Sequence, residues 1–194
     1  MVCVYTPWHL WDFLKSKPRL EILYHSIHYL DLIRSLLGMP QKVYASTVRH
    51  PLVKEYAPTR STIILDYDAY TQARVITNHG HDFGPDKMQS YLKIEGTAGA
   101  IYIQIGVSLD YPKGKPDSFE FVSRTHTDSC WTKVPLKGTW FPDAFVGPMA
   151  RVQQLRKQRS DRQAILEEDL DTMRLVEAMY RSSDHGGMRI TNNQ

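Results

Sequence analysis

Between residues 42 and 136, short segments whose side chains alternate between apolar and polar follow one another, and this run constrains the fold more than any other feature of the chain. Turn-forming residues separate the segments. The expected strands cover residues 42–50, 61–67, 70–79, 90–95, 100–107, 118–124 and 131–136. Short returns between consecutive strands favour antiparallel pairing.

The clearest hairpin joins residues 90–95 to residues 100–107, because both arms alternate and a glycine-containing turn lies between them. We expect Gly96 and Gly99 to supply the positive φ angles that such a turn needs. The segment 61–79 is expected to form a second hairpin around Asp68, although its turn lacks the favoured Asn-Gly or Asp-Gly pair.

Helices are expected before and after the strands in the sequence. The first spans residues 18–40, with Pro18 near its start and Gly38 just past its end. Two more cover about 142–159 and 168–183. Their inward-facing residues should be Phe145, Met149, Val152 and Leu155, and Leu170, Met173, Val176 and Met179.

This order predicts an α+β fold, in which a large, mostly antiparallel sheet carries helices on one face. Residues 1–17 would form an N-terminal arm, and residues 18–194 would form the domain itself. The second face of the sheet would then be available for oligomerisation, so we expect a homodimer or a higher homo-oligomer.

The first helix carries a polar stripe. Because its apolar residues fall on two faces, we expect it to be buried. At about 100° per residue, Tyr24, His28 and Asp31 share a stripe roughly 60° wide, and His25 lies beside it. Buried polar side chains need partners. The stripe is therefore either an acid/base site, in which a carboxylate orients a histidine one turn away, or a core histidine with satisfied hydrogen bonds.

A metal site is an alternative. His25 and His28 on the helix, together with His79 and His81 on a loop, offer four nitrogen ligands, the number that zinc prefers. Nothing in the spacing shows that the loop reaches the helix.

Composition excludes several classes of protein. The net charge is only +3, and the basic residues are spread out apart from a run between Arg151 and Arg162, which argues against nucleic-acid binding. Two isolated cysteines suggest a reducing compartment. The sequence contains no apolar run of about 18 residues, so no membrane span is expected. The first residues lack the features of a signal peptide. A cytoplasmic location is expected.

Three segments carry a family resemblance. HSIHYLDLIRSLLGMP (25–40) resembles the helix that opens the C-terminal domain of the Gfo/Idh/MocA oxidoreductases. KIEGTAGAIYIQI (93–105) resembles the sheet hairpin of that family, and DLDTMRLVEAMYRSSDHGG (169–187) resembles its terminal helix. The resemblance spans most of the chain, with the segments in the family's order.

By this resemblance, His28 would be the catalytic acid/base, and Asp31 would bind or orient a substrate hydroxyl. Tyr24 stands where the family often has Asp, so Tyr24 or His25 would supply the substituting hydrogen bond. The implied function is the substrate-binding and dimerisation domain of an NAD(P)-dependent sugar or polyol dehydrogenase.

The sequence departs from the family in one large respect. It contains no G-x-G-x-x-G turn and no E-K-P motif. We therefore expect that this chain alone holds neither NAD nor NADP, and that it is inactive without a dinucleotide-binding domain. The competing hypothesis is a stand-alone, non-catalytic dimer that is formed through its sheet and binds a small polyol.

Overall fold

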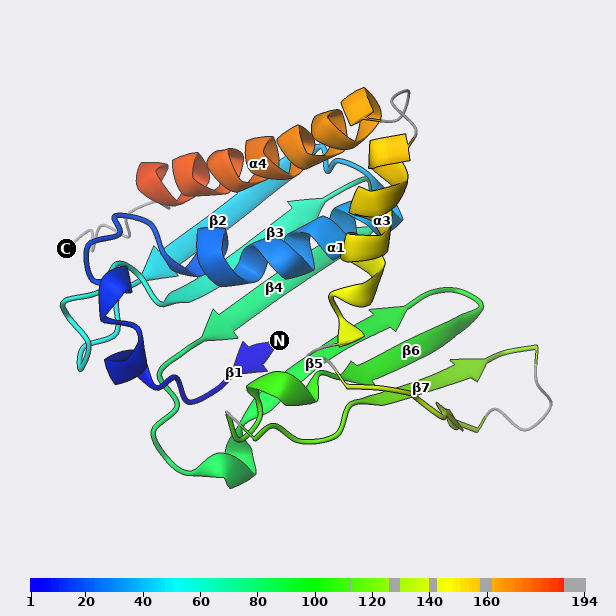
Figure 1. Cartoon of the computed structure of the whole chain (residues 1–194), viewed down its shortest axis with the longest axis horizontal. Helices are drawn as coiled ribbons and strands as arrows, with labels where there is room; N and C mark the ends of the chain where they lie inside the picture. The colour runs from blue at the N-terminus through cyan, green and yellow to red at the C-terminus, as the bar shows by residue number, and fades with distance from the viewer. Residues whose placement is uncertain (112, 126–129, 140–142, 158–161, 187–194) are drawn as a thin grey trace, which may run out of the picture. The chain divides into compact units, whose positions relative to one another are not determined.

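The computed structural model describes residues 1–111, 113–125, 130–139, 143–157 and 162–186 (Figure 1). Its fold is α+β: the described residues form eight strands, paired mostly antiparallel, with helices packed against them. This confirms the fold class expected from the sequence. Residue 142 and residues 158–159 of the helix predicted at about 142–159 lie outside the described residues.

The chain divides into two compact units, which are described separately. The helix unit contains residues 9–77 and the chain from residue 163 onward. The strand unit contains residues 1–8 and 78–162. The residues expected to form an N-terminal arm contribute to both units, and a domain boundary at residues 17/18 stays a prediction.

The helix unit is built from three strands, β2 (Lys42–Val48), β3 (Arg60–Asp66) and β4 (Gln72–Asn78), in the order β2-β3-β4. Helices α1 (Ile27–Leu37) and α4 (Arg162–His185) lie on one face of these strands (Figure 1). The alternation of β3 places Ile63 and Leu65 on that face, where both are fully buried.

The core of the helix unit joins the two helices to the sheet. Leu30 of α1 and Met179 of α4 are completely buried. The remaining buried members of this cluster are Ile22, Ile33, Tyr67, Val75, Leu175, Val176 and Tyr180. Burying a side chain of this size stabilises the fold by about 1.5–3 kcal/mol, so this contact fixes how helix α1 sits on the sheet.

Side chains of α4 protect the edge strand β2. The Ala45 N–H donates to Ser182 Oγ at 3.0 Å, and the Thr47 N–H donates to Ser183 Oγ at 3.0 Å. Edge strands otherwise offer unpaired N–H groups to other chains. The polar C-terminal end of α4 therefore satisfies this edge within the chain.

The strand unit has the order β1-β5-β6-β7-β8. Strand β1 (Val2–Cys3) pairs with β5 (Gln89–Glu95), and β6 (Gly99–Gln104) pairs with β7 (Ser118–Ser123). The last strand is β8 (Thr132–Val134), and helix α3 (Val146–Lys157) belongs to the same unit. The side chains of β6 and β7 are all half-buried, in contrast to the buried positions of β3.

The expected hairpin between β5 and β6 is present, but the reason given for its glycines is wrong. Neither Gly96 nor Gly99 has a positive φ angle. A Cβ atom at Gly99 would lie 2.2 Å from the carbonyl oxygen of Val122 on the neighbouring strand. Gly99 is thus needed for close approach of β7, and the turn closes through a hydrogen bond from Gly96 N to Gly99 O.

Two helical predictions also need correction. Phe145, which directly precedes α3, and Met149 and Val152 of α3 are more than half exposed. They are therefore not core residues within this chain. On α4, Val176 and Met179 are buried as predicted, whereas Leu170 and Met173 are exposed. Helical spacing selects a face, but the neighbouring elements decide which turns of that face are covered.

Candidate functional site

The predicted helix 18–40 starts with a π-helical turn, η3 (Ile22–Ser26), before continuing as α1. The N–H of Ile27 donates to the carbonyl of Ile22, five residues earlier. Gly38 ends the helix at φ 76°, as its position predicts. Single π-turns occur often at functional sites, because the wider turn changes where side chains point.

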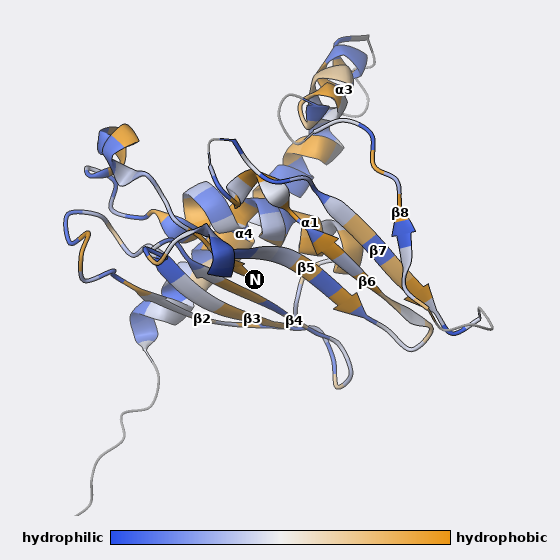
Figure 2. Ribbon diagram, turned by 90° about the horizontal axis from the view of Figure 1, so that it is seen from below, coloured by the Kyte–Doolittle hydropathy of each residue, from blue (hydrophilic) through white to orange (hydrophobic). Residues whose placement is uncertain are grey.

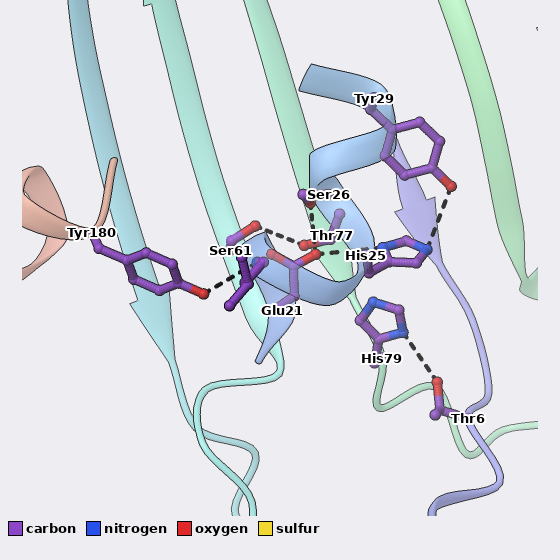
Figure 3. Close-up of polar contacts among 10 residues, drawn as sticks. Thr6, Glu21, His25, Ser26, Tyr29, Ser61, Thr77, His79 and Tyr180 are labelled. Carbon is purple, nitrogen blue, oxygen red and sulfur yellow. Dashed lines mark hydrogen bonds and ion pairs between the residues drawn. The ribbon is translucent and has the colours of Figure 1, made fainter. Parts of the chain in front are cut away.

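The π-turn carries a line of polar side chains that is anchored by a buried carboxylate (Figure 3). Glu21 is only 2% exposed, and its Oε1 accepts a hydrogen bond from Ser26 Oγ at 2.6 Å. His25 Nδ1 lies 3.5 Å from the same oxygen, and His25 Nε2 lies 3.4 Å from the Tyr29 hydroxyl. The contact between Nδ1 and the carboxylate is an ion pair only when the imidazole is protonated, and the donor between Nε2 and the Tyr29 hydroxyl depends on the tautomer of the ring.

This arrangement fixes the imidazole of His25. The ring also meets the Tyr29 ring edge-on, at 5.2 Å between centroids and 74° between planes. A histidine held by a carboxylate on one nitrogen and a phenol on the other can pass a proton between them. His25 is therefore placed to orient or relay, while its side chain remains 25% exposed.

A second phenol supports the same turn. The hydroxyl of Tyr180 on α4 accepts a hydrogen bond from the N–H of Leu23 at 3.2 Å. Burial raises the pKa of Tyr180 to about 12, so this hydroxyl stays neutral over the physiological range. Helix α4 thus supplies an acceptor at a helix start whose first N–H groups have no intrahelical partner.

Tyr24 and His28 lie on the solvent side of the helix. Tyr24 is 45% exposed, and His28 is also exposed. No hydrogen bond to another described residue fixes the ring of His28. The prediction that this helix is buried on two faces is wrong within this chain, because Leu32, Leu36 and Leu37 are exposed as well.

Asp31 shares that exposed side but is directed to helix α4. Its Oδ1 accepts hydrogen bonds from Thr172 Oγ1 at 2.6 Å and from Arg34 Nη2 at 3.0 Å. Arg34 Nε in turn donates to Thr172 Oγ1 at 2.8 Å. These contacts link α1 to α4, and they leave more than half of the Asp31 side chain accessible to a ligand.

The histidines of the metal alternative lie in different units. His25 and His28 belong to the helix unit, and His79 and His81 belong to the strand unit. Within the strand unit, His79 Nδ1 lies 3.1 Å from Thr6 Oγ1, while His81 Nε2 lies 3.0 Å from the Gly84 carbonyl oxygen. A site that combines the four histidines stays a prediction.

The residues missed from the sequence are Glu21, Ser26 and Tyr29. The signal that points to them is the i, i+4 spacing of Glu21, His25 and Tyr29, which brings neighbouring turns together. The polar stripe predicted from the sequence lies on the other side of the helix.

Among the described residues, no helix is long and apolar enough to cross a bilayer.

Comparison with known proteins identifies the class of the domain. The model of the Gfo/Idh/MocA oxidoreductase family's C-terminal alpha/beta domain matches residues 14–191. The chain therefore belongs to this family of C-terminal oxidoreductase domains, as the resemblance implied. No curated protein matches the chain.

Solved structures agree on the fold. An Agrobacterium radiobacter oxidoreductase in complex with NAD⁺, L-tartaric acid and magnesium is 23% identical and has a TM-score of 0.62, with 95% of this chain and 53% of that one covered. The WlbA dehydrogenase of Bordetella pertussis, in complex with NADH and UDP-GlcNAcA, is 18% identical, with a TM-score of 0.58 and coverage of 98% and 54%.

A third similar structure is the aldose-aldose oxidoreductase of Caulobacter crescentus, complexed with glycerol. It is 15% identical, with a TM-score of 0.57 and coverage of 86% of this chain and 46% of that one. The chain thus spans about half the length of the enzymes that it resembles. At these identities, the likeness shows a shared fold.

Proposed function

We propose that this chain is the substrate-binding and dimerisation domain of an NAD(P)-dependent sugar or polyol dehydrogenase that oxidises a substrate hydroxyl by hydride transfer. The family match over residues 14–191, combined with the exposed His28 on the helix that opens the domain, supports this proposal. Three enzymes of the same fold are described with polyol, hydroxy-acid or nucleotide-sugar ligands.

The residues of this chain do not fit a dinucleotide. A Rossmann-type dinucleotide site has a Gly-rich turn between a parallel strand and a helix, and the sequence contains no G-x-G-x-x-G. We therefore confine the chemistry of this chain to substrate binding and proton transfer. A separate dinucleotide-binding domain would have to hold the nicotinamide.

The two cysteines fit an enzyme of a reducing compartment, so the proposed location is the cytoplasm.

In this proposal, His28 accepts the proton of the substrate hydroxyl, because its exposed imidazole can be approached by a substrate and an imidazole nitrogen can act as a general base. Asp31 accepts a hydrogen bond from a neighbouring hydroxyl through the part of its carboxylate that Thr172 and Arg34 leave accessible. Tyr24 and His25 supply further polar contacts, and the Glu21 carboxylate keeps His25 in a fixed orientation.

The first test measures NAD(P)-dependent oxidation of a panel of polyols and sugars by the enzyme that contains this domain. Replacing His28→Ala should lower kcat by about 10²–10⁴-fold. His9→Ala is the matched control, because His9 is an exposed histidine in the same unit. Unchanged turnover in the His28 variant would exclude it as the acid/base.

A titration of the isolated chain with NADH distinguishes a complete enzyme from a domain that depends on a separate cofactor-binding domain. A domain that depends on a partner domain should not bind NADH at micromolar concentrations. Tight binding would overturn the conclusion that the cofactor site lies elsewhere. Binding of a polyol by this chain without any activity in the intact protein would favour the non-catalytic alternative.

The dimerisation part of the proposal rests on one face of the strand unit. Paired residues lie on the same face, and successive residues alternate, which gives the bands of colour on β5, β6 and β7 (Figure 2). The side chains that share the apolar face are Leu92, Ile94, Ile101, Ile103, Phe119, Phe121 and Val134. All of them remain partly exposed.

Covering this face with a second copy would remove a continuous apolar patch from water. Light scattering should show a dimer for the wild-type protein and a monomer for Phe121→Asp. Glu120→Gln is the control, because Glu120 is adjacent on the same strand and faces the opposite side. A monomeric wild-type protein, or a dimer that survives Phe121→Asp, would refute this interface.

A further inference from the structure

A cavity of about 320 Å³ lies within the strand unit, formed by the loop after β4, the loop after β6 and the residues after β1. The rings of Tyr5 and Tyr111 and the thioether of Met88 contribute apolar surface. The carboxylates of Asp82 and Asp110 contribute negative charge. Its size is that of a small-molecule site, and none of the proposed acid/base residues lines it.

Three polar contacts hold the loop after β4 in place. The N–H of His81 donates to the Val4 carbonyl at 3.2 Å, and His81 Nε2 lies 3.0 Å from the Gly84 carbonyl. Because a carbonyl only accepts, Nε2 carries the proton. The N–H of Tyr5 points to Met88 Sδ at 3.3 Å, so the loop that contains Asp82 and Met88 is linked to the residues that follow β1.

The loop after β6 is fixed as firmly. A Cβ atom on Gly106 would lie 1.8 Å from the carbonyl oxygen of Lys115, so the two ends of the loop approach as only glycine allows. The N–H of Gly106 also donates to Asp117 Oδ1 at 2.6 Å. Asp110, at the tip of this loop, has a φ angle of 63°, and its carbonyl accepts from Gly114 N.

Asp110 is a non-glycine residue in the left-handed region, a conformation that costs free energy and recurs at binding sites. Here it places a carboxylate on the cavity wall beside Tyr111. With both loops tied down, ligand binding would require little ordering of the chain, and such preorganisation favours affinity.

The charge of the lining selects the ligand. Among the described residues, His81 is the basic residue that lines the cavity, and its Nε2 is directed to the Gly84 carbonyl. No lysine or arginine among the described residues lines it, and the lysines of the same loops, Lys87, Lys113 and Lys115, are exposed and lie outside it. Two carboxylates repel an anion. They make charge-assisted hydrogen bonds to an ammonium or guanidinium group, which the faces of tyrosine rings also attract.

We propose that this cavity binds a small organic cation, an amine or a guanidine, through Asp82, Asp110 and the rings of Tyr5 and Tyr111. The cation lies between the two carboxylates, and its carbon skeleton packs on the aromatic rings and Met88. This site is separate in its residues from the acid/base helix, so it does not depend on the proposed dehydrogenase activity.

The test is an NMR titration of the ¹⁵N-labelled chain with agmatine and with choline at low ionic strength. Both should shift the amide signals of the two loops, whereas 3,3-dimethylbutan-1-ol, a neutral analogue of choline, should bind at least about tenfold more weakly. Asp110→Asn should weaken agmatine binding by about tenfold or more. Asp86→Asn, an exposed residue of the same loop outside the cavity, should leave it unchanged.

Equal binding of the neutral analogue, or no shift at millimolar agmatine, would overturn the proposal. Stronger binding of glycerol than of agmatine would make the cavity a polyol site and overturn it as well. Tyr111→Phe keeps the ring and should retain binding, whereas Tyr111→Leu should weaken it. The His28→Ala variant should bind agmatine normally, so failure of the proposed catalytic function is distinguishable from failure of this site.

Discussion

Replacing Thr172→Val tests whether a single hydroxyl links the site helix to α4. Thr172 is 5% exposed, and its Oγ1 donates to Asp31 at 2.6 Å while accepting from Arg34 at 2.8 Å. Valine keeps the shape of the side chain and removes both hydrogen bonds. The perturbation therefore isolates polar linkage from packing.

The magnitude follows from the charge of the partners. A hydrogen bond to a charged group contributes about 1.5–3 kcal/mol when it is buried. Asp31 is half exposed and Arg34 keeps its contact with Asp31, so solvent and the remaining ion pair offset part of the loss. We expect the free energy of unfolding to fall by about 2 kcal/mol, which corresponds to a decrease in Tm of about 4–8 °C.

Urea unfolding provides the measurement. The midpoint should decrease with an unchanged slope, because the area exposed on unfolding is the same. Thr172→Ser is the control, since it keeps the hydroxyl and should recover most of the stability. A Thr172→Val protein within about 0.5 kcal/mol of wild type would refute the view that this hydroxyl holds α1 against α4.

Two further changes test the strands. Gly99→Ala places a methyl group 2.2 Å from the Val122 carbonyl oxygen and should destabilise the strand unit by several kcal/mol. In the control Gly96→Ala, the nearest contact of the methyl group is at 3.8 Å, so the loss of stability should be about 1 kcal/mol or less. Equal decreases in Tm for the two variants would contradict this. Two backbone N–H groups of the turn lower the pKa of Asp68, so its contribution to stability is present above the ordinary pKa of an aspartate and is lost as the pH falls through the lowered value. Wild type and Asp68→Asn should accordingly differ in midpoint near neutral pH and converge in strong acid, and a constant difference would argue against the charge.

The sequence predicted much of the fold because its signals are local. Alternation along β5 and β6 located the hairpin, and Gly38 located the end of α1 at a positive φ angle. The family resemblance came from the same segments. Local pattern could not tell why Gly99 is a glycine, because the carbonyl that excludes a side chain belongs to a different hairpin.

The order of the elements, the α+β class and the identity of the polar residues on the first helix follow from the sequence by itself. Only the tertiary structure decided which of those residues are held and which are accessible. The π-turn and the buried Glu21 direct His25 inward, and Thr172 captures one side of Asp31, whereas His28 remains exposed. The physical reason is that burial and the contact with Thr172 depend on α4 and the sheet, which lie far away in the chain. The spacing within residues 18–40 shows which side chains are neighbours, but it does not show which of them are buried.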